Sequence, residues 1–171
     1  MRPSTFKCTS SIRATVFAFA AAVTIATPSQ ATPPSGLTFT PFTTASLDEA
    51  VHFNHDGVKL QTKDPTDVRM QKLDFASGSY TGWHHHPGIV IFALHSGSVT
   101  FWDSNCHPTT YQAGAVFVEG NSSPHQATSS GGATAYVTYI VPDGANFRDE
   151  DAAPFCAASI DAVSKTPSRK E

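Results

Sequence analysis

The chain has 171 residues, of which 40% are hydrophobic and 15% charged, and it carries a formal net charge of −3. This length predicts one domain, and no stretch is basic enough to indicate nucleic-acid binding. The 12 Pro and 11 Gly favour a loop-rich β-protein over a helical bundle.

Residues 1–31 are typical of an export signal. An apolar run of small residues, Ala14–Ala26, is too short to span a bilayer. Ser29 and Ala31 place small residues at the −3 and −1 positions of a signal-peptidase site. The basic residues of the n-region are Arg2, Lys7 and Arg13. We predict cleavage near Ala31 and export to the bacterial periplasm or the extracellular space, with an uncleaved membrane anchor as the alternative. The mature chain would have no membrane span.

Two cysteines, Cys106 and Cys156, remain after this cleavage. A pair of cysteines in an oxidising compartment predicts a disulfide. The bridge would tie the loop after Trp102 to the segment after the last strand. Two free thiols are the alternative.

Along the mature chain, residues 32–56 read as a lead-in. Residues 32–46 are rich in Thr, Pro and Ser and are expected to be flexible, and Leu47–His55 could form a short helix. From Gly57 onward, short apolar runs alternate with turn residues, which predicts a sandwich or barrel of eight to ten short strands over residues 57–142. The apolar run Ile89–Leu94 predicts a strand covered on both faces. Residues 143–171 form a C-terminal segment with a loose tail, tied to the barrel by the predicted disulfide.

Metal-ligating chemistry is indicated by His84 and His86, which are separated by one residue. On a strand, residues i and i+2 share a face and stand about 7 Å apart. Both imidazoles can therefore reach one ion, whereas His85 points the other way. His125, preceded by Pro124, begins a predicted strand that could bring a third imidazole to the same centre. The alternative is that these are ordinary surface or core histidines.

Two segments carry a family resemblance. Gly82–Gly97 resembles the first motif of the cupin superfamily, and Gly114–His125 resembles its second motif. The resemblance implies a single RmlC-like cupin jelly-roll β-barrel, and further features resemble a subgroup of small exported bacterial cupins. It also implies one divalent transition metal (Fe, Mn, Ni, Cu or Zn), a small-molecule ligand or substrate, and pairing of two chains through their sheets as a homodimer.

The sequence departs from the cupin pattern at one point. The first motif usually supplies a glutamate after its second histidine, and here Val90 and Ile91 occupy those places. The centre could use three histidines alone, could recruit Glu119, or could bind metal weakly as a plain ligand pocket. Glu119 is expected to lie at a solvent-exposed turn. Without a carboxylate the ion would keep its full +2 charge, which favours anionic ligands and acidifies bound water.

These observations predict a dioxygenase-like metalloenzyme acting on a small oxygenated organic molecule. The alternative is a non-catalytic, metal-dependent binding or sensing protein of the cell envelope. No residue is assigned a catalytic role. Candidates for lining the cavity are Met70, Phe75 and Tyr139, and the remaining histidines are expected to face away from the centre.

Overall fold

Two long bent strands, β4 (Thr66–Tyr80) and β6 (Ile89–Trp102), organise the fold. The computed structural model describes residues 31–120 and 122–157. The other strands are β1 (Ser35–Leu47), β2 (His52–His55), β3 (Val58–Gln61), β5 (His84–His85), β7 (Pro108–Gln112), β8 (Val116–Glu119), β9 (Gln126–Ser129), β10 (Ala133–Pro142) and β11 (Asp149–Glu150). The predicted all-β barrel is confirmed.

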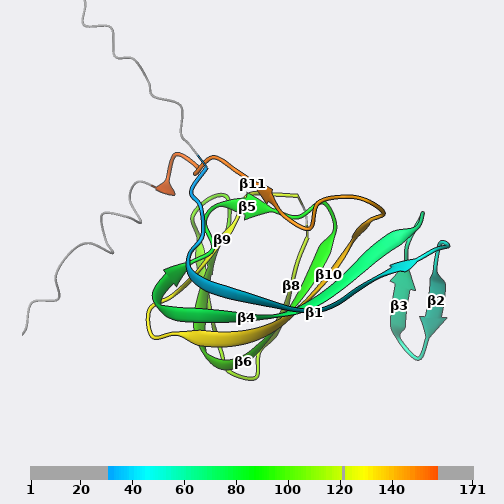
Figure 1. Cartoon of the computed structure of the whole chain (residues 1–171), viewed down its shortest axis with the longest axis horizontal. Helices are drawn as coiled ribbons and strands as arrows, with labels where there is room; N and C mark the ends of the chain where they lie inside the picture. Colours follow the sequence, from blue (N-terminus) through cyan, green and yellow to red (C-terminus); the bar gives the residue numbers. More distant parts are fainter. Residues whose placement is uncertain (1–30, 121, 158–171) are drawn as a thin grey trace, which may run out of the picture.

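The barrel closes through a ring of hydrogen-bonded strands (Figure 1). Strand β4 pairs with β10, β10 with β6, β6 with β9, and β9 with β4. Strand β4 changes partner from β10 to β9 after Phe75, and Gly78 lies between with φ 75°. Strand β6 gains β7 and β9 after Gly97, whose φ is 76°. Glycine adopts this left-handed backbone readily, so each long strand can contribute to two sides of the barrel.

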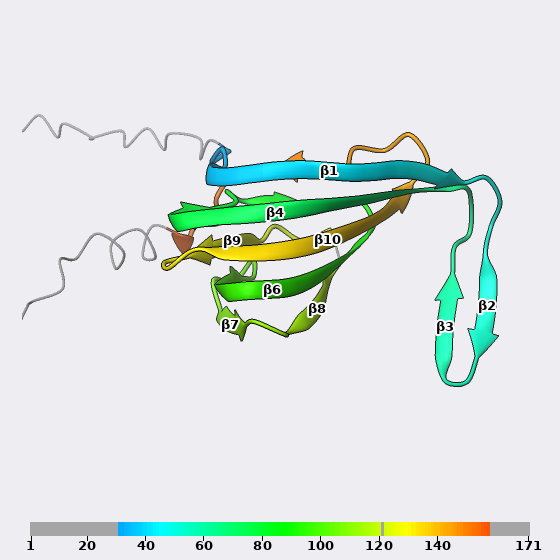
Figure 2. The ribbon, with the colours of Figure 1, turned by 60° about the horizontal axis from the view of Figure 1, so that its bottom comes forward.

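The core lies between these strands and follows their alternation. Val90, Phe92 and Leu94 of β6 are buried, while Ile89 and Ile91 are 39% and 37% exposed. The prediction that this run is covered on both faces is therefore wrong. Antiparallel sheets can leave one face to solvent, and no other layer of the described chain covers the outer face here (Figure 2).

Strand β1 corrects the expectation of a flexible lead-in. It pairs with β4 from Leu47 opposite Thr66 to Ser35 opposite Tyr80. Threonine and phenylalanine have high strand propensity, which the Thr/Pro/Ser composition masked. Pro41 is tolerated because β1 is the outermost strand of the order β1-β4-β10-β6-β7 and shifts register between Pro41 and Thr43.

The expected helix over Leu47–His55 is also replaced by a strand. Strand β2 pairs with β3 as a hairpin around Asp56 and Gly57, both of which have positive φ. Positive φ at both central residues is the signature of a two-residue hairpin turn. The hairpin projects from the end of the barrel at which β1 stops and β4 begins (Figures 1 and 2).

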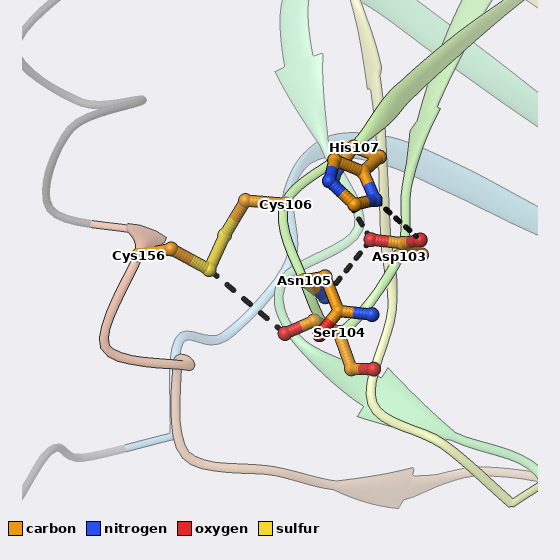
Figure 3. The surroundings of a disulfide bond; sticks show 6 residues. All are labelled: Asp103, Ser104, Asn105, Cys106, His107 and Cys156. Atoms are coloured by element: carbon orange, nitrogen blue, oxygen red, sulfur yellow. Dashed lines mark hydrogen bonds and ion pairs between the residues drawn. A yellow bond between two sulfur atoms is a disulfide. The ribbon is translucent and has the colours of Figure 1, made fainter.

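A C-terminal strap, defined as residues 143–157, runs back beside β5 at one end of the barrel (Figure 1). Its strand β11 pairs with β5, with Glu150 opposite His84. A disulfide joins Cys106 to Cys156 with a Cα–Cα distance of 6.0 Å. Asp103 Oδ1 accepts hydrogen bonds from the backbone N–H groups of Asn105 and His107 and so shapes the loop that carries Cys106 (Figure 3).

The predicted signal peptide lies outside the described residues except for Ala31, which forms an isolated bridge with Ala152. Within residues 31–120 and 122–157, the structure contains no helix long and apolar enough to cross a membrane.

Candidate metal centre

Three buried histidines, His84, His86 and His125, meet inside the barrel. One ring nitrogen from each lies within 4.8 Å of the others, a spacing that could hold a metal ion. His84 and His125 are joined by two backbone hydrogen bonds, His84 N to His125 O at 3.0 Å and His125 N to His84 O at 2.8 Å. His86 follows two residues after His84, as the strand-parity argument requires.

Backbone carbonyls fix the orientation of all three rings. The Nδ1 atoms of His84, His86 and His125 lie 2.9, 2.6 and 3.0 Å from the carbonyl oxygens of Gly82, Phe147 and Ser123. A carbonyl only accepts hydrogen bonds, so each Nδ1 must carry a hydrogen and donate it. The Nε2 atoms are then available as lone-pair donors, and this is how ligating histidines are commonly held.

Glu119 enters the same cluster, which corrects the expectation of a solvent-exposed turn. Its Oε2 lies 3.3 Å from Nε2 of His86 and 3.4 Å from Nε2 of His125, and the residue is only 7% exposed. Strand β8 continues through Glu119, which pairs with Val90 of β6. Residues directly opposite each other in an antiparallel pair share a face, so the carboxylate points inward beside Val90.

The electrostatics of the cluster are those of several acceptors that face one another. Burial by itself raises the pKa of Glu119, but its interactions with the neighbouring His125 and His86 side chains lower it to about 2. Burial, reinforced by the charges of His125 and Arg148, lowers the pKa of His84 well below its usual value. Nε2 of His125 is buried and has no hydrogen-bond partner in the described chain. A carboxylate and three Nε2 lone pairs can converge stably only around a proton or a metal ion, so these residues fit a divalent metal.

The cavity beside the cluster is small, at about 30 Å³, which holds one or two water molecules. Tyr139 is one of its lining residues, and the others are Phe39, Leu73, Thr81, His84, His86, Phe92, Glu119, Ala127, Val137 and Arg148. Phe75 is buried in the core, with its ring 6.3 Å from that of Phe92, but it is not among the lining residues.

Met70 does not line the cavity and is 46% exposed. The continuous β4–β10 register over residues 66–75 places odd-numbered residues of β4 such as Gln71 and Leu73 inward, so Met70 faces outward. The prediction that Met70 lines the cavity was wrong. Even-numbered Met70 and odd-numbered Phe75 lie on opposite faces of β4, and only the odd-numbered face points inward.

His85 points away from the cluster, as predicted, but it is not left to solvent. Its Nδ1 lies 2.8 Å from Oδ2 of Asp151, and its Nε2 lies 3.7 Å from Oδ2 of Asp149. Both carboxylates belong to the strap, so His85 anchors the strap on the outside of the strand whose inner face carries the site.

The strap supplies two groups to the site that sequence reasoning missed. Phe147 contributes the carbonyl that holds His86, and Arg148 lines the cavity. Neither stands in a recognisable motif. The sequence held one weak indication that Glu119 points inward, because Glu119 is two residues after Phe117 and so shares its face of the strand. Val116 and Val118 are apolar as well, so no alternation of apolar and polar residues is visible there.

No family model and no curated protein matches the chain. Among solved structures, it is similar to a double-stranded β-helix protein from Klebsiella pneumoniae (20% identity, 61% of this chain and 85% of that chain, TM-score 0.44). It is also similar to an RmlC-like cupin from Shewanella frigidimarina (16% identity, 64% and 79%, TM-score 0.43). A salicylate 1,2-dioxygenase from Pseudaminobacter salicylatoxidans shows 16% identity over 57% of this chain and 23% of that chain, with a TM-score of 0.39.

Proposed function

We propose that this protein is an exported, metal-binding cupin and a dioxygenase-like metalloenzyme that acts on a small oxygenated organic molecule. The observation that carries the proposal is the convergence of three carbonyl-oriented imidazoles and Glu119 in a buried cavity. Imidazole and carboxylate together suit first-row transition metals. When bound, such an ion would supply Lewis acidity and, if redox-active, electron exchange with O₂.

The carboxylate changes the expected charge of the centre. Three neutral imidazoles would leave a divalent ion at +2, whereas Glu119 reduces the total to +1. A centre with charge +1 still attracts a monoanion, but it acidifies a bound water less than a three-histidine centre does. Glu119 therefore makes hydroxide generation less favourable, while the centre keeps a positive charge that attracts a monoanion.

The remaining polar side chains of the cavity are poor acid–base catalysts. Burial, followed by the charge of Glu119, raises the pKa of Tyr139 well above its usual value, so its hydroxyl stays protonated. Thr81 and Arg148 are the other polar lining residues that are not candidate ligands, and a guanidinium has no acceptor site with which to take up a proton. Among the described residues of the cavity, no general base is left over, which supports chemistry centred on the metal.

The test is oxygen consumption by protein loaded separately with Fe, Mn, Ni, Cu or Zn. Phenolic and enolic compounds are screened under O₂, with His125→Ala protein as the control. We expect substrate-dependent O₂ uptake with at least one redox-active metal and none with the variant. Uptake that persists in His125→Ala, or absence of uptake with every metal and compound, would contradict the catalytic proposal.

The small cavity favours a second candidate, a metal-dependent binding or sensing protein without turnover. A space for one or two water molecules limits the size of a bound substrate. This candidate predicts a ligand-dependent rise in melting temperature with no product by mass spectrometry, whereas product formation would exclude it.

Export remains part of the proposal and is supported by the Cys106–Cys156 pairing, because disulfides persist mainly in oxidising compartments. Expression of the full chain in a bacterium, followed by fractionation and N-terminal sequencing, tests it. We expect a secreted or periplasmic chain that begins at Thr32. A full-length chain in the cytoplasm would contradict it.

A further inference from the structure

We propose that Arg148 is the specificity-determining residue of this site and that it selects a small carboxylate as the ligand. The inference rests on the proposed metal site and adds the chemical class of its ligand. Arg148 reaches the cavity from the strap, on the side of the β5–β11 pairing, and it lies outside the two segments that resemble the cupin motifs.

The guanidinium of Arg148 is held rigidly at the cavity. Its Nη2 donates to the carbonyl oxygen of Thr81 at 2.6 Å and to Oε2 of Glu150 at 2.9 Å, and its Nε donates to Oε1 of Glu150 at 2.6 Å. The side chain is only 20% exposed. No bond to Nη1 is present among residues 31–120 and 122–157, so one nitrogen of the fork remains for a ligand. A fixed guanidinium loses little entropy when it binds a carboxylate.

The positive charge of Arg148 acts on the interior of the site. Arg148 lines the same cavity as His84, His86 and Glu119. A bound metal with Glu119 would carry +1, and Arg148 adds a positive charge whose partner Glu150 is 42% exposed. With the charge of Glu150 included, the metal, Glu119, Arg148 and Glu150 leave one net positive charge, which suits a monoanion that bridges the metal and Arg148.

Tyr139 supplies a further donor on the cavity wall. Its hydroxyl oxygen accepts a hydrogen bond from Nε2 of Gln71 at 2.8 Å, so its own hydrogen remains to be donated. A carboxylate has two oxygens and accepts from two directions at once. A bulky tetrahedral dianion fits less well, because the cavity is small and contains the carboxylate of Glu119.

The opposing interpretation is that Arg148 only fastens the strap. The two interpretations make opposite predictions for Glu150→Gln, which keeps a hydrogen-bonding partner for Arg148 but removes the competing negative charge. If Arg148 binds the ligand carboxylate, Glu150→Gln should raise anion affinity. If it serves only as a fastener, the same change should leave anion affinity unchanged or lower it.

The experiment uses the exported protein loaded with Co²⁺, whose visible absorption reports on ligands at the metal. Metal stoichiometry is measured first for every variant, so failure to load cobalt counts against the metal site and not against Arg148. Acetate is then titrated, with acetamide as its neutral counterpart of the same shape.

We expect acetate to perturb the spectrum and acetamide to have little effect. Arg148→Gln should weaken acetate binding roughly tenfold or more, since hydrogen bonds to charged groups are the strong ones. The acetate affinity of Arg148→Lys should lie between those of wild type and Arg148→Gln. Glu150→Gln should bind acetate more tightly than wild type. Equal acetate affinity in wild type and Arg148→Gln, or weaker binding in Glu150→Gln, would overturn the proposal. If Arg148→Gln fails to fold, the Lys and Glu150 variants decide the outcome.

Discussion

Glu119 lies directly opposite Val90 in the pairing of β6 with β8, and both side chains are buried on the inner face of the barrel. Val90 occupies one of the places at which the first cupin motif usually carries its glutamate. The carboxylate thus enters the cluster from the neighbouring strand. The protein thus has an acidic group at the site although residues 82–97, which resemble the first cupin motif, lack one.

This cross-strand relationship predicts that the carboxylate can be moved from position 119 to position 90 without losing the metal site. Glu119→Val should weaken metal binding by at least about tenfold, because the cluster loses its negative ligand. The double variant Glu119→Val/Val90→Glu should recover much of that loss, since the new side chain starts directly across the ladder. Isothermal titration with Zn²⁺ measures both. A double variant no better than Glu119→Val would show that the facing positions are not equivalent.

Metal binding should release a proton. Glu119, with a pKa of about 2, is ionised at neutral pH, and its Oε2 lies 3.3 Å from an Nε2 whose ring already donates through Nδ1. Two acceptors at this separation need a shared proton, which the metal must displace. We expect about one proton released per metal, and therefore an affinity that falls as pH falls. Titrations in buffers of different ionisation enthalpy measure the release, and a value of zero would contradict this picture.

The disulfide should stabilise both the fold and the site. It closes a loop with a sequence separation of 50, worth about 4 kcal/mol in the chain-entropy model. Cys106→Ser/Cys156→Ser should lower the free energy of unfolding accordingly in urea, and should weaken metal binding because the strap carries the Phe147 carbonyl. Non-reduced peptide mapping should link the two cysteines in wild type. Two alkylatable thiols there would refute the bridge.

Gly82 should tolerate no side chain. A Cβ there would lie 1.8 Å from the carbonyl oxygen of Thr32, and its φ is +72°. Gly82→Ala should therefore destabilise the protein by more than the roughly 1–3 kcal/mol of backbone strain alone. Gly114→Ala is the matched control, since its φ is +91° but nothing lies within 4 Å of the added Cβ. If urea denaturation shows that Gly82→Ala and Gly114→Ala lose the same free energy of unfolding, the contact with Thr32 is absent in solution.

Sequence reasoning worked where the controlling information was local. The spacing of His84 and His86 encodes their common direction through strand parity, and Pro124-His125 lies just before a strand that the alternation pattern predicts. Turn residues and short apolar runs were enough for an all-β barrel.

Local patterns failed where the outcome depended on pairing across the barrel. Glu119 is buried because of its register against Val90, which no residue near it in sequence reports. Residues 35–47 form β1 because they lie along β4, despite a composition typical of a loop. Arg148 reaches the cavity because β11 pairs with β5 and the disulfide holds the strap. Such long-range contacts are set by tertiary packing and override local propensity.

Binding of one divalent metal ion by His84, His86 and His125 underlies the proposed function. It is tested most directly by plasma mass spectrometry of the exported protein, purified without chelators or an added His tag. We predict about one transition metal per chain in wild type and in His85→Ala, and its loss in His84→Ala and in His125→Ala. No metal in wild type even after reconstitution, or equal loss in all three variants, would contradict the account.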